Sequence, residues 1–458
     1  MKKGRKMRFA IIFVILLLLL SSTATFAGNG HERFNMSYLY FGSPDNYVQL
    51  VDRTNNSLNM VSPNYFDVNQ EGNLVFTDKF RESFVADMHS RGIKVVPFLA
   101  NHWDRTAGEN AFKNRHALST EVAEYVETYN LDGINVDIEG VGHAYRDEHT
   151  DFIRLLREKI PAHKEVSVAV AANPNGWTTG WHGNYDYTEL AKHADYLMIM
   201  AYDEHWQGST PGPVASYSFV ERSIQYALNQ QVPKEKVVIG IPFYGRMWKT
   251  DGERNADGFL INGRGISHNQ IQTVVNHYNG EVIFDEASQT PKAVFTVTDN
   301  DPIISAEGVR LTAGDYVIWF DNEQSFKKKL ELINEYDIKG TGSWALMRED
   351  PQMWDYYKTY LNGGTMATTP EEDIVVEPEP VEDEPVIDPD PEPTPEIIEE
   401  EEEVISDSGN NGRGNGKGRN KNTTEDVQNE EDSGDNQLEE PINGNNGNGN
   451  GNGNGRNR

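Results

Sequence analysis

The sequence contains no cysteine, which excludes disulfide bonds and thiolate chemistry. Basic residues are also few, because 41 lysines and arginines stand against 72 aspartates and glutamates, for a formal net charge of −31. Nucleic-acid binding requires a basic face, so the charge balance argues against that class of function. The histidines lack the spacing of metal ligands, and we expect neither a metal nor a cofactor.

Long apolar runs are scarce as well. The run at the start of the chain, residues 9–20, is short for a membrane span and follows five basic residues. Small or polar residues come next, and Thr25-Phe26-Ala27 fits a cleavage site. We therefore predict that residues 1–27 are a signal peptide and that the protein is secreted. An uncleaved membrane anchor is the alternative.

The acidity is concentrated in the last part of the chain, where residues 366–458 hold roughly 26 acidic and 6 basic residues. Residues 370–403 are rich in proline and glutamate, and residues 443–457 repeat glycine and asparagine. Such compositions cannot bury enough apolar surface to fold. We predict a disordered tail over residues 365–458, which is either a solvated spacer or a contact with the cell wall or the spore surface.

Between these ends, residues 30–362 alternate short apolar runs with helix-like stretches, which predicts an α/β fold, a (β/α)8 TIM barrel. The expected strands are residues 37–41, 57–62, 94–100, 133–139, 166–172, 196–201, 237–244 and 342–346. The expected helices include residues 78–91, 119–129, 149–159, 218–229 and 325–336. Residues 247–320 are too long for a simple connection between strands seven and eight, and their strand-like pieces predict a small inserted subdomain.

Residues 131–139 have the pattern of a buried strand that ends in carboxylates. Side chains of a strand alternate, so its aliphatic residues face one way while Asn135, Asp137 and Glu139 face the other. Two carboxylates two residues apart repel each other, and one should hold a proton near pH 7, as a general acid requires. A plain strand with one solvated face is the alternative, but it explains less well why the polar face is acidic and amide.

This segment resembles the active-site strand of glycoside hydrolase family 18, whose Asp-Gly-x-x-x-Asp-x-Glu pattern is matched by Asp132, Gly133, Asp137 and Glu139. Asn135, where many chitinases have a further aspartate, resembles the branch of spore cortex-lytic glycosylases and spore germination proteins of bacilli. The resemblance covers residues 33–362 and implies an α+β insertion between strands seven and eight.

Later segments carry the same resemblance. Met200-Ala201-Tyr202-Asp203 is similar to the family's motif on strand six, and Trp344 matches the tryptophan under the reacting sugar. The run 202–216 resembles the spore germination branch in particular. Two features depart from the known patterns: no LysM repeat fits between residue 28 and the barrel, and Asn101-His102-Trp103 replaces the Ser-x-Gly-Gly of many chitinases.

The carboxyl ends of barrel strands carry the active site in this architecture, and here six of them carry aromatic or amide side chains. A single aromatic residue is most simply core packing, but together they predict a sugar-binding site. The predicted catalytic residues are Glu139, Asp137 and Tyr202, and the predicted substrate-binding residues are Asn135, Asp203, Trp344, Tyr40, Asn101 and Arg246.

The resemblance implies substrate-assisted retaining catalysis, in which the 2-acetamido oxygen of the substrate attacks the anomeric carbon. Glu139 is then the general acid and base. Asp137 stabilises the acetamido group and the oxazolinium ion, and Tyr202 orients that group. Asn135 is expected to hold Asp137, Asp203 to contact the reacting sugar, and Trp344 to form the apolar floor.

We therefore predict a monomeric, secreted glycoside hydrolase, associated with the wall or the spore, that cleaves a polysaccharide containing N-acetylglucosamine. The resemblance favours the peptidoglycan of spore cortex. A chitinase or an endo-N-acetylglucosaminidase is an alternative enzyme, and a non-catalytic glycan-binding protein of the spore or wall surface is the alternative from another class. The sequence leaves open the exact glycan and endo versus exo cutting.

Overall fold

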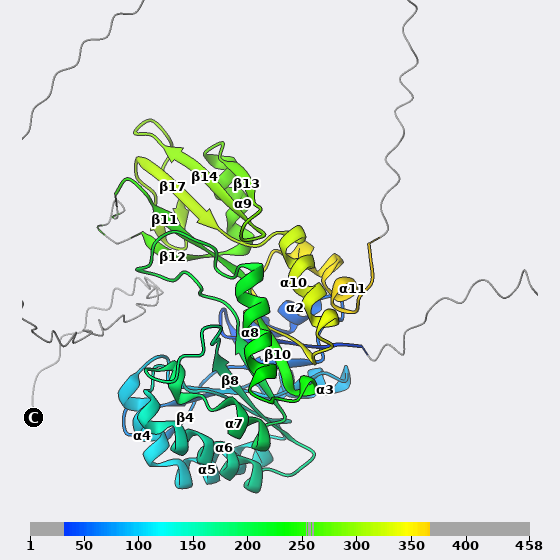
Figure 1. Ribbon diagram of the computed structural model, residues 1–458. Coiled ribbons are helices and arrows are strands. Elements are labelled where there is room, and N and C mark those ends of the chain that lie inside the picture. The colour runs from blue at the N-terminus through cyan, green and yellow to red at the C-terminus, as the bar shows by residue number, and fades with distance from the viewer. Residues whose placement is uncertain (1–31, 253, 255–257, 259–260, 367–458) are drawn as a thin grey trace, which may run out of the picture. The chain divides into compact units, whose positions relative to one another are not determined.

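Eight parallel strand positions form a ring in the computed structural model, which describes residues 32–252, 254, 258 and 261–366 (Figure 1). The predicted signal peptide and almost all of the predicted tail lie outside the described residues. In chain order the ring consists of β1 (Phe34–Leu39), β2 (Met60–Pro63), β5 (Lys94–Val95) continued by β6 (Phe98–Ala100), β7 (Gly133–Asp137), β8 (Glu165–Ala171), β9 (Tyr196–Met200), β10 (Val237–Pro242) and β18 (Gly340–Trp344).

The third position closes the ring, although it is split in two. Strand β2 pairs in parallel with β5, and β6 pairs in parallel with β7. Pro97 lies between the two halves and has no N–H to donate to a ladder, so the regular strand is interrupted there. The N–H of Val96 still donates to Val61 O at 3.0 Å, and the N–H of Asn135 donates to Pro97 O at 2.9 Å. At the other end of the strand order β18 pairs with both β1 and β10, and the predicted TIM barrel is confirmed.

Helices cover the outside of the ring. Helices α5 (Arg115–Thr128), α6 (Arg146–Lys159), α7 (Tyr187–His193) and α8 (Tyr217–Asn229) pack against β7, β8, β9 and β10 in turn (Figure 1). The others are α2 (Tyr47–Asp52), α3 (Glu82–Ser90), α4 (Arg105–Lys113), α10 (Glu323–Glu335) and α11 (Tyr357–Leu361). The five helices expected from the sequence are present with shifted ends, as α3, α5, α6, α8 and α10.

Helices α4 and α7 are not among those predicted from the sequence, for different reasons. Helix α4 buries Ala107, Gly108 and Ala111 with one large residue, Phe112, so few large apolar side chains mark its buried face. Helix α7 has seven residues, which is too short for a periodic pattern to be recognised. Both helices begin with an aspartate whose side chain accepts a backbone hydrogen bond, which is a better signal than their periodicity.

Alternation along the strands separates two cores. Ile134, Val136 and Ile138 belong to the large core between the strands and the helices. The side chains on the other face of each strand, among them Tyr38 and Phe98, fill the inside of the ring. The aliphatic face predicted for residues 131–139 is therefore confirmed as the outer face of β7, and the polar face points into the barrel.

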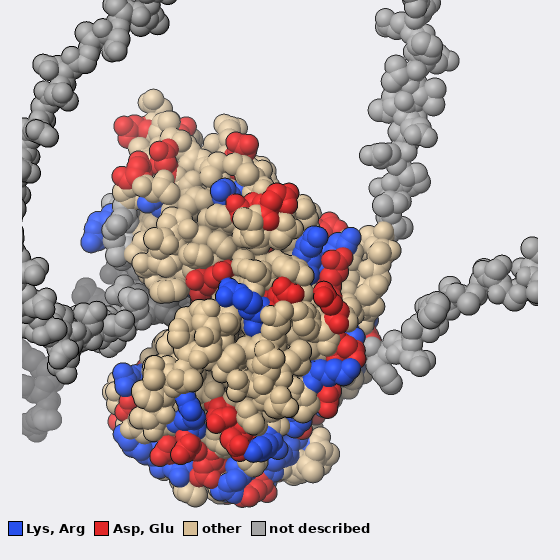
Figure 2. Space-filling view, in the orientation of Figure 1, with Lys and Arg blue, Asp and Glu red and all other residues tan. Residues whose placement is uncertain are grey.

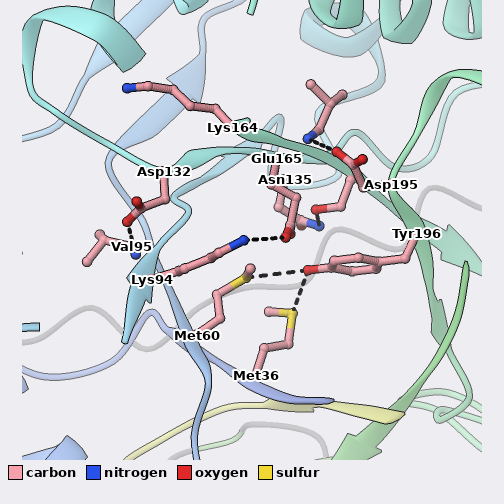
Figure 3. Close-up of polar contacts among 12 residues, drawn as sticks. Met36, Met60, Lys94, Val95, Asp132, Asn135, Lys164, Glu165, Asp195 and Tyr196 are labelled. Atoms are coloured by element: carbon pink, nitrogen blue, oxygen red, sulfur yellow. Dashed lines mark hydrogen bonds and ion pairs between the residues drawn. The ribbon is translucent and has the colours of Figure 1, made fainter. Parts of the chain in front are cut away.

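The amino-terminal end of the barrel interior contains a buried carboxyl group (Figure 3). Glu165 is 8 % exposed and burial raises its pKa to about 7, while Lys94 Nζ lies 3.9 Å from its Oε2. The hydroxyl of Tyr196 lies between the sulfur atoms of Met36 and Met60, at 3.3 and 3.5 Å. This end of the barrel is thus filled with side chains and is not a channel.

A second sheet follows β10, at the place where the insertion was predicted. Its antiparallel order is β12-β11-β17-β14-β13, and α9 packs against it. The elements are β11 (Tyr244–Lys249), β12 (Asn262–Ser267), α9 (His268–His277), β13 (Glu281–Asp285), β14 (Thr290–Val297), the small pair β15 (Ser305–Ala306) and β16 (Val309–Arg310), and β17 (Gly314–Trp319). The α+β insertion is confirmed, and it has an apolar core of its own.

A short hairpin, β3 (Phe66–Val68) and β4 (Leu74–Phe76), extends the barrel sheet beside β6. On the face shown in Figure 2, acidic and basic side chains mix over the helices α5 to α7. The ion pair Arg115–Asp151 joins α5 to α6, and Arg154–Glu158 lies within α6. No helix in the described ranges is both long and apolar enough to span a bilayer.

Replacement of Gly133 with alanine tests the close approach of β7 and β8. Gly133 has a φ of +149°, and a Cβ atom there would lie 2.1 Å from the carbonyl oxygen of Glu165. We expect Gly133→Ala to lower the free energy of unfolding by about 3 kcal/mol, because left-handed strain and overpacking act together. Urea denaturation followed by circular dichroism measures this loss.

The matched control is Gly92→Ala, since Gly92 also has a left-handed φ, +73°, but its Cβ would meet nothing within 4 Å. This variant should lose only the strain contribution, about 1 kcal/mol. Equal losses in the two variants would show that strand spacing is not what requires glycine in the motif.

Candidate active site

Strand β7 carries Asp137 to the carboxyl-terminal end of the barrel interior. Asp137 is 7 % exposed, and its Oδ1 has no hydrogen-bond partner within the described part of the chain. Burial raises the pKa of Asp137 to about 7, against the opposing effect of a positive charge on His102. The carboxyl group of Asp137 therefore gains or loses its proton near neutral pH, as is common for groups that take part in catalysis.

Glu139 lies two residues further on, just past the end of β7. Burial raises the pKa of Glu139 well above its ordinary value, and the charges of Asp137 and Asp203 raise it further. A raised pKa favours the protonated carboxyl group, which can donate its proton. This is the arrangement that the spacing of the two carboxylates predicts.

Asn101 holds the backbone of Glu139. Its Oδ1 accepts from the N–H of Glu139 at 2.8 Å, and its Nδ2 donates to the carbonyl oxygen of Glu139 at 2.8 Å. Its Nδ2 also lies 2.9 Å from the carbonyl oxygen of Asp104. Asn101 was predicted to bind substrate, but its amide is committed to protein groups, and we propose that it positions the acid instead.

Asn135 has partners that the sequence does not predict. Its Oδ1 accepts from the hydroxyl of Tyr38 at 2.8 Å, and its Nδ2 donates to Ser167 Oγ at 2.9 Å. The expected direct support of Asp137 by Asn135 is therefore not what the structure shows. Fully buried Asn135 instead fixes Tyr38 and Ser167, which come from β1 and β8, in the layer beneath the carboxylates.

Strand β9 leads into Tyr202 and Asp203. The Tyr202 ring is partly buried against both cores, and burial together with nearby acidic groups, including Asp137 and Glu139, raises its pKa well above the ordinary value. Tyr202 therefore keeps its proton and can donate a hydrogen bond. Asp203 has a left-handed backbone, φ +58°, which turns the chain immediately after Tyr202.

Asp203 is bound by two residues of the insertion. Arg246 donates to it twice, from Nε at 2.8 Å and from Nη2 at 2.7 Å, and the hydroxyl of Tyr244 donates to Oδ1 at 2.7 Å. The third donor of Arg246, Nη1, is 2.7 Å from the carbonyl oxygen of Gly263. Arg246 was predicted to bind substrate, but its guanidinium group is buried in these contacts, and we propose that it holds Asp203 in place.

Aromatic rings surround Trp344, at the end of β18. The ring centroids of Tyr38, Tyr40, Phe98 and Phe41 lie 5.3, 5.4, 6.0 and 6.2 Å from that of Trp344. Trp344 and Tyr40 are only partly buried, so each retains some exposed surface. The two predicted substrate-binding aromatics are thus brought together, beside Tyr38 that bonds to Asn135.

Further aromatic residues, of which Trp103 and Trp177 are exposed, lie near Gly140, the residue after Glu139, and were not selected from the sequence. A Cβ on Gly140 would be 3.2 Å from the ring of Trp103, whose centroid lies 5.0 Å from that of Trp181. The ring of His182 lies between those of Trp181 and Trp177 in tilted contacts, with centroids 4.2 and 4.6 Å away. Residues 177–181 contain two tryptophans, which is a signal for sugar binding, but nothing in the sequence indicates that Trp181 packs against Trp103.

No cluster of three or more candidate metal ligands occurs in the ranges that the structure describes. The site is therefore built from carboxylates, hydroxyls and aromatic rings at the carboxyl ends of barrel strands. A barrel with a buried carboxyl pair beside exposed aromatic rings is the arrangement of barrel glycoside hydrolases.

Comparison with known proteins identifies which group of glycosidases this is. Residues 36–349 match the family model of glycosyl hydrolases family 18. The chain belongs to this family.

Among the curated relatives are bacterial enzymes named for sporulation or for the lysis of cortical fragments, together with di-N-acetylchitobiases of mouse and human. YdhD of Bacillus subtilis, provisionally designated a sporulation-specific glycosylase, is 29% identical over 233 residues, which are 51% of either chain. A cortical fragment-lytic enzyme of Bacillus subtilis is 27% identical over 247 residues, 52% of either chain. The chain thus spans about half the length of the curated relatives it matches.

Solved structures share the fold. A chitinase from Chromobacterium violaceum is 24% identical, with a TM-score of 0.62 and coverage of 72% of this chain and 99% of that one. The spore cortex-lytic enzyme SleL from Bacillus cereus is 20% identical, with a TM-score of 0.61 and coverage of 73% and 74%.

The raised pKa of Asp137 leads to a prediction about stability. A carboxyl whose pKa is higher in the folded protein than in the unfolded chain favours folding at low pH, and that contribution is lost as the pH rises from about 4 to about 7. Asp137→Asn removes this loss. We expect the variant to gain about 1–3 kcal/mol over the natural protein at pH 7.5, and little or nothing at pH 4.5.

Urea denaturation at both pH values measures this difference. Asp299→Asn, at an exposed position of the insertion, serves as the control and should show no such pH-dependent gain. A gain of equal size at pH 4.5 and pH 7.5 would contradict the electrostatic explanation.

Proposed function

We propose that this protein is a retaining glycoside hydrolase that cleaves a polysaccharide containing N-acetylglucosamine with the help of the substrate's own acetamido group. The observation that carries the proposal is the carboxyl pair Asp137 and Glu139, both on one face of β7 and its extension, with Tyr202 near them. A protein nucleophile would have to approach the anomeric carbon from the face opposite the leaving group, and neither carboxylate of this strand can do so while the other donates a proton.

In the first step, protonated Glu139 gives its proton to the glycosidic oxygen while the acetamido oxygen attacks the anomeric carbon. The bond from that carbon to the leaving oxygen breaks, and a cyclic oxazolinium ion forms. Ionised Asp137 accepts a hydrogen bond from the acetamido N–H and stabilises the positive charge that develops. Tyr202 donates to the acetamido oxygen before the attack and orients it.

In the second step, Glu139 acts as a base. It takes a proton from a water molecule whose oxygen attacks the anomeric carbon, and the ring of the oxazolinium ion opens to regenerate the acetamido group. Two displacements at the same carbon give net retention of configuration. Trp344 supplies the apolar surface under the reacting sugar, and Asp203, fixed by Arg246, limits how far Tyr202 can move.

The proposed substrate is the peptidoglycan of spore cortex. Its support is the similarity to cortical fragment-lytic enzymes and to YdhD. Chitin and N-glycan cores also present a 2-acetamido sugar, and the fold is shared with a chitinase, so these remain the alternatives. The row of aromatic residues that leads away from Gly140 supports a substrate longer than two sugars, because pyranose faces pack on aromatic rings.

We also propose that the protein is a secreted monomer located at the wall or the spore. The charged and apolar start of the chain supports secretion, and the relatives support the location. The acidic region after residue 366, which lies outside the described residues, is proposed as a spacer or as a contact with that surface.

Glu139→Gln tests the assignment of the acid. We expect a loss of at least about 10²–10⁴-fold in turnover on reduced spore-cortex fragments, because no proton is delivered to the leaving oxygen. Product release followed by mass spectrometry measures the rate, and circular dichroism checks the fold. Glu124→Gln, on an exposed position of α5, is the control and should keep full activity.

More than about a tenth of the natural turnover in Glu139→Gln would remove Glu139 from the role of acid. Binding of cortex fragments without any hydrolysis by the natural protein would instead favour a glycan-binding protein. Comparing cortex fragments, vegetative wall and chitin oligomers in the same assay identifies the substrate.

The source of the nucleophile is tested with matched glycans. A substrate with a free 2-amino group at the cleavage point has no acetamido oxygen, so it should bind but react at least about 10³-fold more slowly. A thiazoline analogue of N-acetylglucosamine, which mimics the cyclised intermediate, should inhibit competitively. A covalent sugar ester on any carboxylate, seen by mass spectrometry of the trapped protein, would overturn the mechanism.

A further inference from the structure

The turn after β6 carries a backbone distortion that the chemistry above does not explain. His102 and Trp103 both have left-handed backbones, with φ of +49° and +61°. For residues with a Cβ atom this conformation costs about 1–2 kcal/mol each, and such strain persists only where the surrounding structure enforces it. Glycine would relieve the strain, so the side chains at these two positions merit a functional explanation.

Strand pairing puts His102 beside the catalytic pair. Ala100 lies opposite Asp137 in the parallel register of β6 and β7, and the next residue, Asn101, binds the backbone of Glu139. The ring of His102 is 5.9 Å from that of Tyr40, between centroids. His102 therefore lies at the exposed edge of the active site, with 40 % of its side chain accessible, and its positive charge opposes the effect of burial on Asp137.

Asp67 orients the imidazole ring from the opposite direction. His102 Nε2 lies 2.8 Å from Asp67 Oδ1, and the same oxygen accepts from Asn64 Nδ2 at 2.8 Å. Lys79 in turn donates to Asn64 Oδ1 at 3.0 Å. Asp67 is on β3, which pairs with β6, so the carboxylate and the imidazole are held by neighbouring strands.

We propose that His102, held by Asp67, is a positioning residue that acts on Asp137: as an imidazolium it keeps the catalytic aspartate ionised for the step in which the oxazolinium ion forms. The proposal rests on the proposed function, because it assigns Asp137 the role of stabilising that ion. It explains why the chain has a strained histidine at a place where glycine would be unstrained. It also supplies the charge compensation that Asn135, engaged with Tyr38 and Ser167, does not give.

The other charged groups around this pair are engaged with other partners. Glu139 and Asp203 are acidic, Asp203 is paired with Arg246, and Tyr38, Tyr185 and Tyr202 are hydroxyls whose pKa values are raised by burial. On the side of His102, Asp67 is acidic, and Lys79 is a cation that donates to the carbonyl oxygen of Tyr40 and to Asn64 Oδ1, both at 3.0 Å. Among these groups, His102 is the one whose positive charge lowers the pKa of Asp137.

Three variants separate charge from shape. His102→Gln keeps a hydrogen-bonding side chain toward Asp67 but cannot be charged, and His102→Lys restores a positive charge. Asp67→Asn leaves His102 in place and removes the carboxylate that orients it. All three keep a Cβ atom at a strained or paired position, so differences in backbone strain are small.

The acidic limb of the pH profile of kcat/KM on cortex fragments reports the ionisation of Asp137. We expect His102→Gln to move this limb to higher pH by about 0.5–1 unit, which is a 3–10-fold loss of activity on the acidic side and a smaller loss above pH 8. His102→Lys should return the limb toward its natural position. Asp67→Asn should lower kcat more than it raises KM.

A second readout does not require catalysis. Replacing His102 should increase the stability gained from Asp137→Asn at pH 7.5, because an ionised Asp137 then lacks the positive charge of His102. A cycle of the two single variants and the double variant measures this coupling. If the natural protein hydrolyses no glycan, the proposed function fails while this coupling still tests the His102–Asp137 interaction. If His102→Gln does not fold, the profile of Asp67→Asn decides.

Uniform scaling of the whole pH profile in His102→Gln, with no restoration by lysine and no coupling in the stability cycle, would overturn the proposal. His102 would then be a residue that only shapes the turn. A shift of the acidic limb together with measurable coupling supports the role of His102.

Discussion

Burial of two carboxyl groups at the open end of a barrel is the constraint around which this structure is arranged. Asp137 and Glu139 repel each other, and their burial makes the ionised forms costly. Such a pair persists only where rigid neighbours fix it, and here the neighbours are strands on both sides. Strand β6 leads to Asn101 on the backbone of Glu139, and Tyr38 and Ser167 fix Asn135 below. The strands therefore hold Asp137 and Glu139 close together although the two carboxyl groups repel each other.

The sequence predicted the features that depend on local pattern and missed those that depend on strand register. Alternation in residues 131–139 correctly separated the inner and outer faces of β7, since that pattern is a property of one strand alone. The partners of Asn135 come from β1 and β8, and no pattern within the chain specifies which residues lie opposite across a barrel. The contacts of Arg246 with Asp203 depend in the same way on how the insertion meets the barrel.

The insertion contributes to the site through its first strand. Tyr244 and Arg246 on β11 bind Asp203, which directly follows Tyr202. Arg348, just after β18, contacts Ser267 at 3.1 Å and Glu307 at 3.4 Å, so the barrel and the insertion are joined at a second place. A change in β11 would therefore act on Asp203, the residue next to Tyr202, although the insertion has a separate apolar core.

The two hydrogen bonds between Asn101 and the backbone of Glu139 also limit which residues can replace Asn101. Its amide reproduces the donor and acceptor of a peptide group, so the side chain behaves as one more rung of the β6–β7 ladder. Aspartate has the acceptor without the donor, leucine has neither, and glutamine is longer by a methylene group. A residue that need not touch the sugar can thus be restricted as tightly as the acid itself, by the backbone it holds and not by the substrate.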